Sequence, residues 1–185
     1  MILNARGFTL TELLAAFAVV GLVLAGVLSL LLQVQRSYLL GAARVEAQQN
    51  ARVAIERMAQ EIRLAGYDPT TAGFTALANP TETSLTLQND WNGDGVIRGS
   101  GEVVTYLLRG TTLRRNAGGG AQPVVQGVER LRFVYLDAAG VATADPKAIR
   151  TVEVSITAAP ERAGASGATG HVGVVMTTSV RLRNR

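Results

Sequence analysis

The 185-residue chain is 48% hydrophobic and has a formal net charge of +4. Its 18 Lys and Arg residues are spread along the chain among 14 Asp and Glu residues, which favours a solvated, arginine-rich surface over a dedicated nucleic-acid surface. The chain has no cysteine and a single histidine, His171. These counts exclude disulfides, thiolate metal sites, a cysteine nucleophile and multi-histidine metal sites within one chain.

A long apolar run dominates the first part of the chain. Residues Leu13–Gln35 include no charged side chain, and Leu13–Leu32 is almost wholly apolar. At 1.5 Å per residue, about twenty helical residues span roughly 30 Å, the thickness of a bilayer's hydrocarbon core. The run is too long for the apolar region of an ordinary secretory signal, and no small-residue cleavage site follows it before Arg36. The sequence therefore predicts a membrane helix that the mature protein keeps.

The residues before this run form a specific motif. Met1–Gly7 is short and includes Arg6, and it is followed by Phe8-Thr9-Leu10-Thr11-Glu12. The motif resembles the class III signal of type IV prepilins and of type II secretion pseudopilins. The resemblance implies that a prepilin peptidase cleaves after Gly7 on the cytoplasmic side and methylates the new amino group of Phe8. Arg6 agrees with a leader that stays in the cytoplasm.

Glu12 places a carboxylate at the edge of the apolar run, where an unpaired charge is costly. The resemblance implies that it pairs with the freed amino terminus of a neighbouring subunit during assembly; the alternative is a carboxylate in the headgroup zone. Gly21, Ala25 and Ser29 recur at intervals of four and would allow close helix packing in lipid. Residues 1–68 contain no proline, whereas major pilins often have one here, so the pattern favours a minor pilin or a pseudopilin.

The helix is predicted to continue from Gln33 to about Gly66, before the stop signal Asp68-Pro69. One apolar stripe is predicted to pack on a sheet, rather than to lie on a membrane surface: Ala51, Ile55, Met58, Ile62 and Ala65. The opposite, solvent-facing side has Arg52, Glu56, Arg57, Gln60, Glu61 and Arg63, with Glu56–Gln60 and Arg57–Glu61 as surface pairs.

Two parts of the sequence show which pilin-like proteins the chain resembles in particular. Gln49–Glu56 and Ile62–Tyr67 are similar to the corresponding stretch of PilW-type minor pilins, and Thr177–Arg183 is similar to their final strand. J-type pseudopilins share this layout, so both families stay open. The resemblance implies the α+β type IV pilin fold. Its parts would be a leader (1–7), a transmembrane assembly half of the helix (8–35), an exposed amphipathic half (36–67) and a β-rich domain (68–185).

Short alternating segments predict an antiparallel sheet in the β-rich domain. The expected strands are Ser84–Gln88, Val103–Leu108, Thr112–Arg115, Val128–Leu136, Thr151–Ala158 and Val172–Leu182. Arg109-Gly110 predicts a hairpin turn. Gly118–Gly120 and Ala163–Gly170 are predicted loops, and His171 is predicted to be an ordinary strand residue.

One loop has the pattern of a calcium site. Asp90, Asn92 and Asp94 place side-chain oxygens at alternate positions, Gly95 would make the sharp turn, and Val96 would offer its backbone carbonyl. The closing acid, Glu102, falls one residue later than a calcium-binding loop of the EF-hand type requires. Similar loops occur in PilW-type proteins and in calcium-stabilised pseudopilins. The alternative is an Asn/Asp/Gly-rich surface turn.

The function expected from these features is structural: a minor pilin that helps to initiate or cap a type IV pilus. A type II secretion pseudopilin is the alternative within this class. The implied partners are other pilins or pseudopilins, prepilin peptidase and the assembly platform. The implied location is the bacterial inner membrane, crossed once with the C-terminal domain outside the cytoplasm, and then the filament or its tip.

A tip module that binds DNA or a surface is a second possibility, for which the available cations are Arg109, Arg114, Arg115, Arg130 and Arg132. Nucleic acid is not the favoured partner, since no aromatic platform accompanies these arginines. No nucleophile–base pair is recognisable, so we expect neither an enzyme nor an organic cofactor, and no catalytic residue is predicted.

Overall fold

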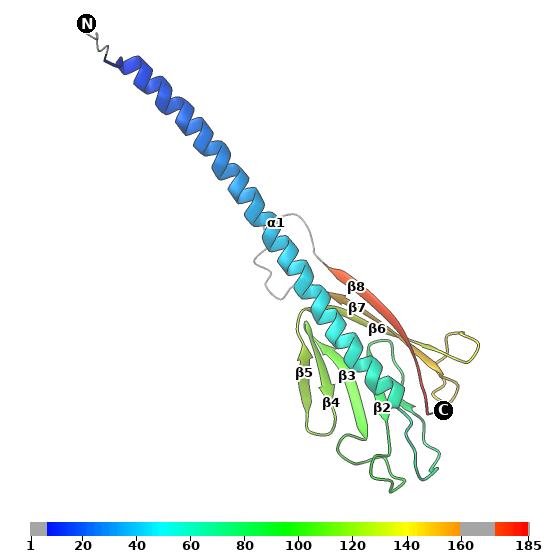
Figure 1. The fold of residues 1–185 in the computed structure, drawn as a ribbon. Helices are drawn as coiled ribbons and strands as arrows, with labels where there is room; N and C mark the ends of the chain where they lie inside the picture. Colours follow the sequence, from blue (N-terminus) through cyan, green and yellow to red (C-terminus); the bar gives the residue numbers. More distant parts are fainter. Residues whose placement is uncertain (1–6, 160–172, 185) are drawn as a thin grey trace. The chain divides into compact units, whose positions relative to one another are not determined.

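The computed structural model describes residues 7–159 and 173–184. The chain divides into two compact units, Met1–Gly41 and Ala42–Arg185. Helix α1 (Leu10–Leu64) runs through the division, and the strands all lie in the second unit (Figure 1). The predicted loop Ala163–Gly170, His171 and the predicted first strand residue Val172 lie outside the described residues.

Helix α1 ends two residues before the glycine at which the sequence predicted its end. Gly66 follows with a positive φ of 82°, a conformation that glycine adopts without strain. The side-chain amide of Asn184 donates to the Leu64 carbonyl oxygen at 2.8 Å, which satisfies one of the carbonyls that a helix leaves unpaired at its end.

The described strands of the second unit form antiparallel sheets, which confirms the predicted α+β fold of a helix packed on an antiparallel β domain, although there are two sheets where the sequence predicted one. The first has the order β1-β2-β3-β4-β5, and the second has the order β6-β7-β8 (Figure 1). The bounds are β1 Leu77–Ala78, β2 Ser84–Gln88, β3 Val103–Arg109, β4 Thr112–Asn116, β5 Ala121–Val125, β6 Val128–Leu136, β7 Thr151–Ala158 and β8 Val174–Arg181. The predicted hairpin turn is confirmed, since Gly110 lies between the paired residues Arg109 and Thr112.

The core lies between the second half of α1 and the two sheets. The predicted helical stripe is confirmed: Ala51, Ile55, Met58, Ile62 and Ala65 are all buried. Each sheet contributes the inward residues of its alternating strands, such as Leu85 and Leu87 of β2 and Val152, Val154 and Ile156 of β7. Burial of a side chain as large as Met58 or Ile62 contributes about 1.5–3 kcal/mol, so this stripe anchors the helix to the sheets.

Candidate processing and assembly site

The described part of the processing motif begins at Gly7, and residues 7–9 precede the first turn of α1. Thr9 and Glu12 form a reciprocal capping box there. The Glu12 carboxylate oxygen Oε2 accepts hydrogen bonds from the backbone N–H of Thr9 at 2.9 Å and from its hydroxyl at 2.9 Å. The Glu12 backbone N–H donates to Thr9 Oγ1 at 3.3 Å. The two residues thus satisfy each other's free backbone donors, which fixes where the helix starts.

This arrangement gives Glu12 a role within its own chain. The carboxylate lies in the first turn, where a negative charge also stabilises the positive end of the helix dipole. The sequence analysis missed this, although Thr9-Leu10-Thr11-Glu12 is the Thr-x-x-Glu pattern of a capping box. Pairing of Glu12 with a neighbouring subunit would therefore use a carboxylate that its own helix has already oriented.

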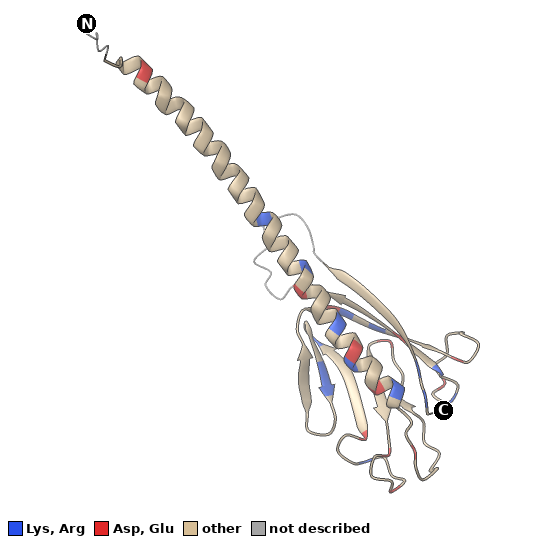
Figure 2. Ribbon diagram, in the orientation of Figure 1, with Lys and Arg blue, Asp and Glu red and all other residues tan. Residues whose placement is uncertain are grey.

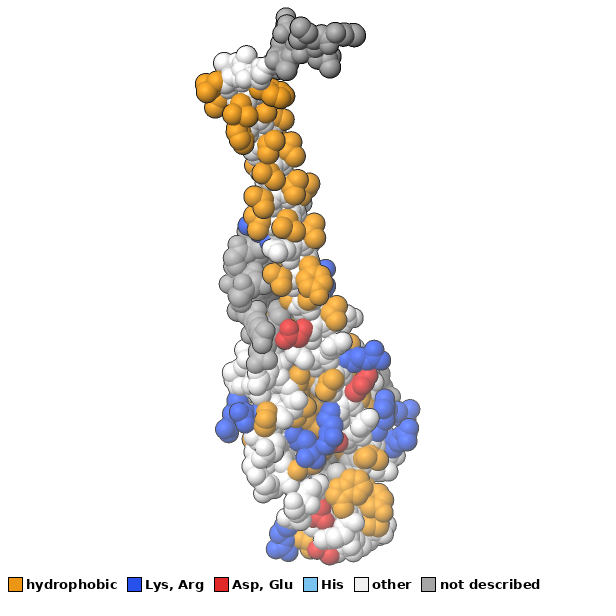
Figure 3. Space-filling view, turned by 60° about the vertical axis from the view of Figure 1, so that its left-hand side comes forward, with side chains coloured by type: hydrophobic (Ala, Val, Ile, Leu, Met, Phe, Trp, Pro, Cys, Tyr) orange, Lys and Arg blue, Asp and Glu red, His pale blue; other side chains and the backbone are white. Residues whose placement is uncertain are grey.

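Beyond the capping box, the first unit is one apolar helix segment. Among the described residues, α1 is the helix long and apolar enough to cross a membrane, with a window of mean hydropathy 2.7 and no residue of that window buried. Large apolar side chains such as Phe17, Leu22 and Leu30 are exposed, and orange side chains cover this segment in Figure 3. An apolar surface of this extent needs lipid or other apolar helices around it.

The predicted small-residue series lies on this segment. The Ser29 hydroxyl donates to the Ala25 carbonyl oxygen at 2.8 Å, which hides the polar group within the helix. A Cβ added at Gly21 would meet no atom within 4 Å. The face is therefore open and without unsatisfied polar groups, as close helix packing in lipid requires.

Comparison with known protein families identifies the start of the chain. Residues 2–28 match the family described as the prokaryotic N-terminal methylation motif, a stretch that includes Gly7, Phe8 and Glu12. The match supports a type IV pilin-like protein. The match fits a membrane-anchored pilin or pseudopilin with a structural role. Such a protein interacts with other pilins and with a prepilin peptidase. Among curated proteins, none matches the chain.

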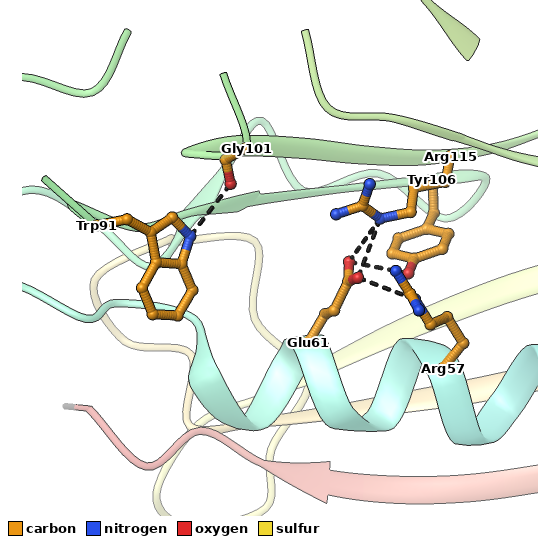
Figure 4. A network of polar contacts seen from close by, with 6 residues as sticks. All are labelled: Arg57, Glu61, Trp91, Gly101, Tyr106 and Arg115. Carbon is orange, nitrogen blue, oxygen red and sulfur yellow. Dashed lines mark hydrogen bonds and ion pairs between the residues drawn. The ribbon is translucent and has the colours of Figure 1, made fainter. Parts of the chain in front are cut away.

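In the second unit, the carboxylate of Glu61 on α1 binds three side chains (Figure 4). It accepts hydrogen bonds from the Tyr106 hydroxyl at 2.9 Å, from Arg115 Nε at 3.0 and 3.1 Å, and from Arg57 Nε at 3.1 Å. The predicted Arg57–Glu61 pair is confirmed, but the prediction of a solvent-facing Glu61 was wrong, since its side chain is only 18% exposed. The network ties α1 to β3 and β4 through a charged group.

The pKa values of two partners follow from this setting. Burial lowers the pKa of Arg115, but the hydrogen bond and charge of Glu61 outweigh that effect and raise it above the usual value. Burial raises the pKa of Tyr106, and the charge and hydrogen bond of Glu61 raise it further. Both groups therefore keep their protons at neutral pH, and both can donate to Glu61.

The predicted calcium loop is well ordered by its own hydrogen bonds. The buried Asp90 carboxylate accepts from the backbone N–H groups of Gly93 at 2.8 Å, Asp94 at 3.2 Å and Gly95 at 3.0 Å, and from the Thr70 hydroxyl at 3.2 Å. These four bonds occupy about the full acceptor capacity of a carboxylate.

The other predicted calcium ligands have partners of their own. The amide group of Asn92 donates to Asp94 Oδ2 at 3.1 Å. The Val96 carbonyl accepts from the backbone N–H of Arg98 at 3.1 Å. Glu102 is buried and accepts from the backbone N–H groups of Arg98 and Gly99. Within residues 7–159 and 173–184, no group of three or more His, Cys, Asp or Glu side chains is gathered where a metal ion could bind.

An exposed aromatic pair borders this loop. The rings of Tyr67 and Trp91 stack with centroids 5.3 Å apart. Trp91 Nε1 donates to the Gly101 carbonyl oxygen at 3.2 Å, which fixes the indole (Figure 4).

The arginines considered for DNA lie on several strands and are partly engaged. Arg115 binds Glu61, Arg114 donates to the Ala121 carbonyl oxygen at 2.9 Å, and Arg132 Nε lies 3.6 Å from Glu82 Oε2. Arg109 and Arg130 are exposed. Two of the five, Arg114 and Arg115, thus bind groups of the fold, and Arg132 faces an acid, which weakens this set as a nucleic-acid surface.

Proposed function

We propose that this chain is a minor pilin of the PilW type that helps to initiate a type IV pilus or forms part of its tip complex. Prepilin peptidase would cut after Gly7 and methylate Phe8, and the domain that follows α1 would lie outside the cytoplasm. The observation that carries the proposal is the Glu12 carboxylate, which the capping box holds at the start of an exposed apolar helix, four residues after Phe8.

The physical basis of assembly would be the same as for any apolar membrane helix. Transfer of α1 from lipid into a filament exchanges lipid contacts for helix contacts, so apolar packing alone leaves the register poorly defined. A charge pair between Glu12 and the Phe8 amine of a neighbour has one favourable register, because an unpaired carboxylate in apolar surroundings is costly. Glu12 would therefore determine the register, and the apolar surface would provide most of the contact area.

The alternative within this class is a minor pseudopilin of type II secretion. The lack of proline in residues 1–68 and the layout of helix and sheets agree with both machines. Genes for pilus assembly next to this gene would support the pilus, whereas genes for a secretion channel would support the pseudopilin.

Three variants separate the two roles of Glu12. Glu12→Gln keeps a side chain that can complete the capping box but removes the charge, and Glu12→Leu removes both. Thr9→Ala removes the capping hydroxyl but keeps the carboxylate. We expect membrane insertion in all three. Filament incorporation, measured as this protein in sheared filaments, should fall strongly in both Glu12 variants and only slightly in Thr9→Ala.

Normal incorporation of Glu12→Gln would rule out register selection by charge. An equal loss in Thr9→Ala and Glu12→Gln would instead assign the effect to the helix start. Leader cleavage, measured as the mass of the mature chain, serves as the control, because each variant must be processed before its incorporation can be compared.

We also propose that the loop from Asp90 to Glu102 binds calcium. Carboxylate, amide and backbone carbonyl oxygens are the ligands that calcium prefers, and Asp90, Asn92, Asp94, Val96 and Glu102 supply them. Because Asp90 already accepts four hydrogen bonds, ligation by it would displace at least one of them. The ion would then stiffen a loop that the aromatic pair borders.

The test compares thermal unfolding of the detergent-solubilised chain with calcium and with a chelator. We expect calcium to raise the unfolding temperature, and Asp94→Asn to abolish that rise. Asp137→Asn is the matched control, because Asp137 also accepts backbone hydrogen bonds in an exposed loop. No calcium-dependent shift in the unaltered chain would reject the site.

A further inference from the structure

Four arginines line one cleft of the second unit. The cleft has a volume of about 560 Å³ and is lined by Arg63, Arg150, Ser179, Val180, Arg181, Leu182 and Arg183. It lies where the end of α1 meets the end of β8, and Figure 2 shows basic segments at both places. All but one of the 18 basic residues of the chain are arginine, the exception being Lys147.

Hydrogen bonds, one from a side chain and the others between backbone groups, fix the three segments that carry these arginines. Asn184 binds the Leu64 carbonyl at the end of α1, next to Arg63. The Leu182 N–H donates to the Arg150 carbonyl oxygen at 2.9 Å, and Arg181 pairs with Thr151 at the edge of the sheet. The clustering therefore follows from the fold and does not depend on flexible side chains alone.

Arg150 is also held through its guanidinium group. Its Nη1 donates to the carbonyl oxygens of Lys147 at 2.8 Å and Ile149 at 3.0 Å. A guanidinium has five N–H donors, and its bonds to the described residues use only Nη1, which leaves Nε and Nη2 for a ligand. A donor that is already oriented loses less entropy on binding than a freely rotating side chain.

Among residues 7–159 and 173–184, no carboxylate side chain lines the cleft. Among the described residues, the arginines in ion pairs are Arg52, Arg57, Arg115 and Arg132, all outside the cleft. Glu153 is the nearest acid by register, since it pairs with Ser179 of β8. A single arginine in the last turn would suffice to stabilise the helix dipole, so this role does not account for the other three.

The charge and shape of the cleft favour phosphate over carboxylate. A carboxylate offers two oxygens in one plane, whereas a phosphate group, with one or two negative charges, offers its oxygens on a tetrahedral centre that several guanidinium forks can approach at once. A cleft of 560 Å³ is within the range that encloses a small ligand, enough for an anion with several phosphate groups.

We propose that this arginine cleft binds successive phosphate groups, supplied either by a free polyphosphate or by the phosphodiester chain of a nucleic acid. The site differs from the strand arginines considered from the sequence, and it does not depend on the role of the chain in a filament.

The test uses the full chain in neutral detergent micelles and three probes: tripolyphosphate, a single-stranded oligonucleotide of about twelve nucleotides, and a hexaglutamate peptide. Tripolyphosphate binding is measured by calorimetry and oligonucleotide binding by fluorescence anisotropy over a range of salt concentrations. The variant Arg63→Gln/Arg181→Gln is compared with Arg109→Gln/Arg130→Gln, which removes the same charge from exposed sites outside the cleft.

We expect the cleft variant to lose about tenfold in affinity for each arginine removed, and the control variant to bind nearly as well as the unaltered chain. For the oligonucleotide, the salt slope should fall by about 0.7 for each lost phosphate contact. Tripolyphosphate binding alone would support a compact oligophosphate, and oligonucleotide binding alone would support the phosphodiester chain.

Three results would overturn the proposal: no binding of either phosphate probe, an equal loss in the two variants, or hexaglutamate binding as tight as that of tripolyphosphate. Unfolding temperatures of both variants are measured alongside. Because the two glutamine variants change surface side chains, we expect both to remain folded.

Discussion

Glu61 shows how much one carboxylate can connect. It is placed on the polar side of α1, yet it binds side chains from two strands of the first sheet. Loss of its charge would leave Arg115 and the Tyr106 hydroxyl with a weaker acceptor in a partly buried place. A buried group that loses its partner costs more than a surface ion pair contributes.

We therefore expect Glu61→Gln to lower the free energy of unfolding by about 1–3 kcal/mol. Glu56→Gln is the matched control, since Glu56 is on the same helix and pairs with Arg52 in an exposed position. That change should cost less than about 1 kcal/mol. Denaturant unfolding of the three proteins in the same detergent checks both values, and equal effects would contradict a special role for Glu61.

Two buried tyrosines predict a loss of stability at alkaline pH. Burial raises the pKa of both Tyr106 and Tyr135 above the ordinary value of 10.0. The Tyr135 hydroxyl donates to the backbone carbonyls of Thr81 and Ser84, which cannot bind a phenolate. The stability that depends on the neutral phenols is fully present below pH 10 and is lost as the pH rises from there toward the raised values.

The unfolding temperature should consequently fall as the pH rises above about 10. Tyr135→Phe should flatten that fall, although it would itself lower stability at neutral pH through the loss of its hydrogen bonds. A scan of unfolding temperature from pH 7 to 11 on both proteins tests this, and parallel curves would contradict it.

At the scale of elements, the turn after α1 depends on one glycine. A Cβ at Gly66 would lie 2.7 Å from the Asn184 carbonyl oxygen and 2.9 Å from Ala76 Cβ. Gly140 has a similar positive φ, 79° against 82°, but a Cβ there would meet nothing within 4 Å. Alanine substitutions at Gly66 and Gly140 therefore separate the cost of backbone strain from the cost of steric conflict.

Gly140→Ala should cost only the strain of a left-handed residue, about 1–2 kcal/mol. Gly66→Ala should cost about 1–3 kcal/mol more, because its neighbours include backbone that must shift. Thermal unfolding of the two variants gives the comparison. Equal losses would mean that the contact between the helix end and residue 184 is adaptable.

Strands with strict alternation, such as β2 and β7, could be predicted to the residue, whereas β5 could not. Ala121–Val125 contains Pro123 and follows a glycine run, which indicates a loop. Proline is tolerated because β5 is the last strand of its sheet. The division into two sheets was equally hidden, since alternation identifies which face of a strand is buried but not its neighbours.

Some of the candidate sites could likewise be predicted from the sequence, and others could not. The motif that contains Gly7, Phe8 and Glu12 is local in the sequence, so these residues can be recognised from the sequence alone. The Glu61 network and the arginine cleft join residues far apart in the chain, such as Glu61 with Arg115 and Arg63 with Arg183. Such contacts depend on strand order, which local periodicity does not determine.

For the whole molecule, the two parts of α1 should respond differently to the same charge. Val20 and Val53 are similarly exposed, at 52% and 54%, but Val20 lies in the apolar segment and Val53 in the second unit. Val20→Arg should weaken membrane insertion by about 2.5–3.5 kcal/mol or more, whereas Val53→Arg should leave it unchanged. Alkaline extraction of membranes measures the retained fraction. Equal retention would argue against residues 8–35 as the span.

The contact between Asn184 and Leu64 has a consequence for the order of folding. The two residues are 120 positions apart, so the helix end receives this cap only when nearly the whole second unit has been made. Contacts between residues so far apart in the chain form late in folding, because the entropy cost of closing a large loop comes before the contact can stabilise the structure. Segment 181–184 would then complete two features together, the capped end of α1 and the arginine cleft, after the rest of the second unit has folded.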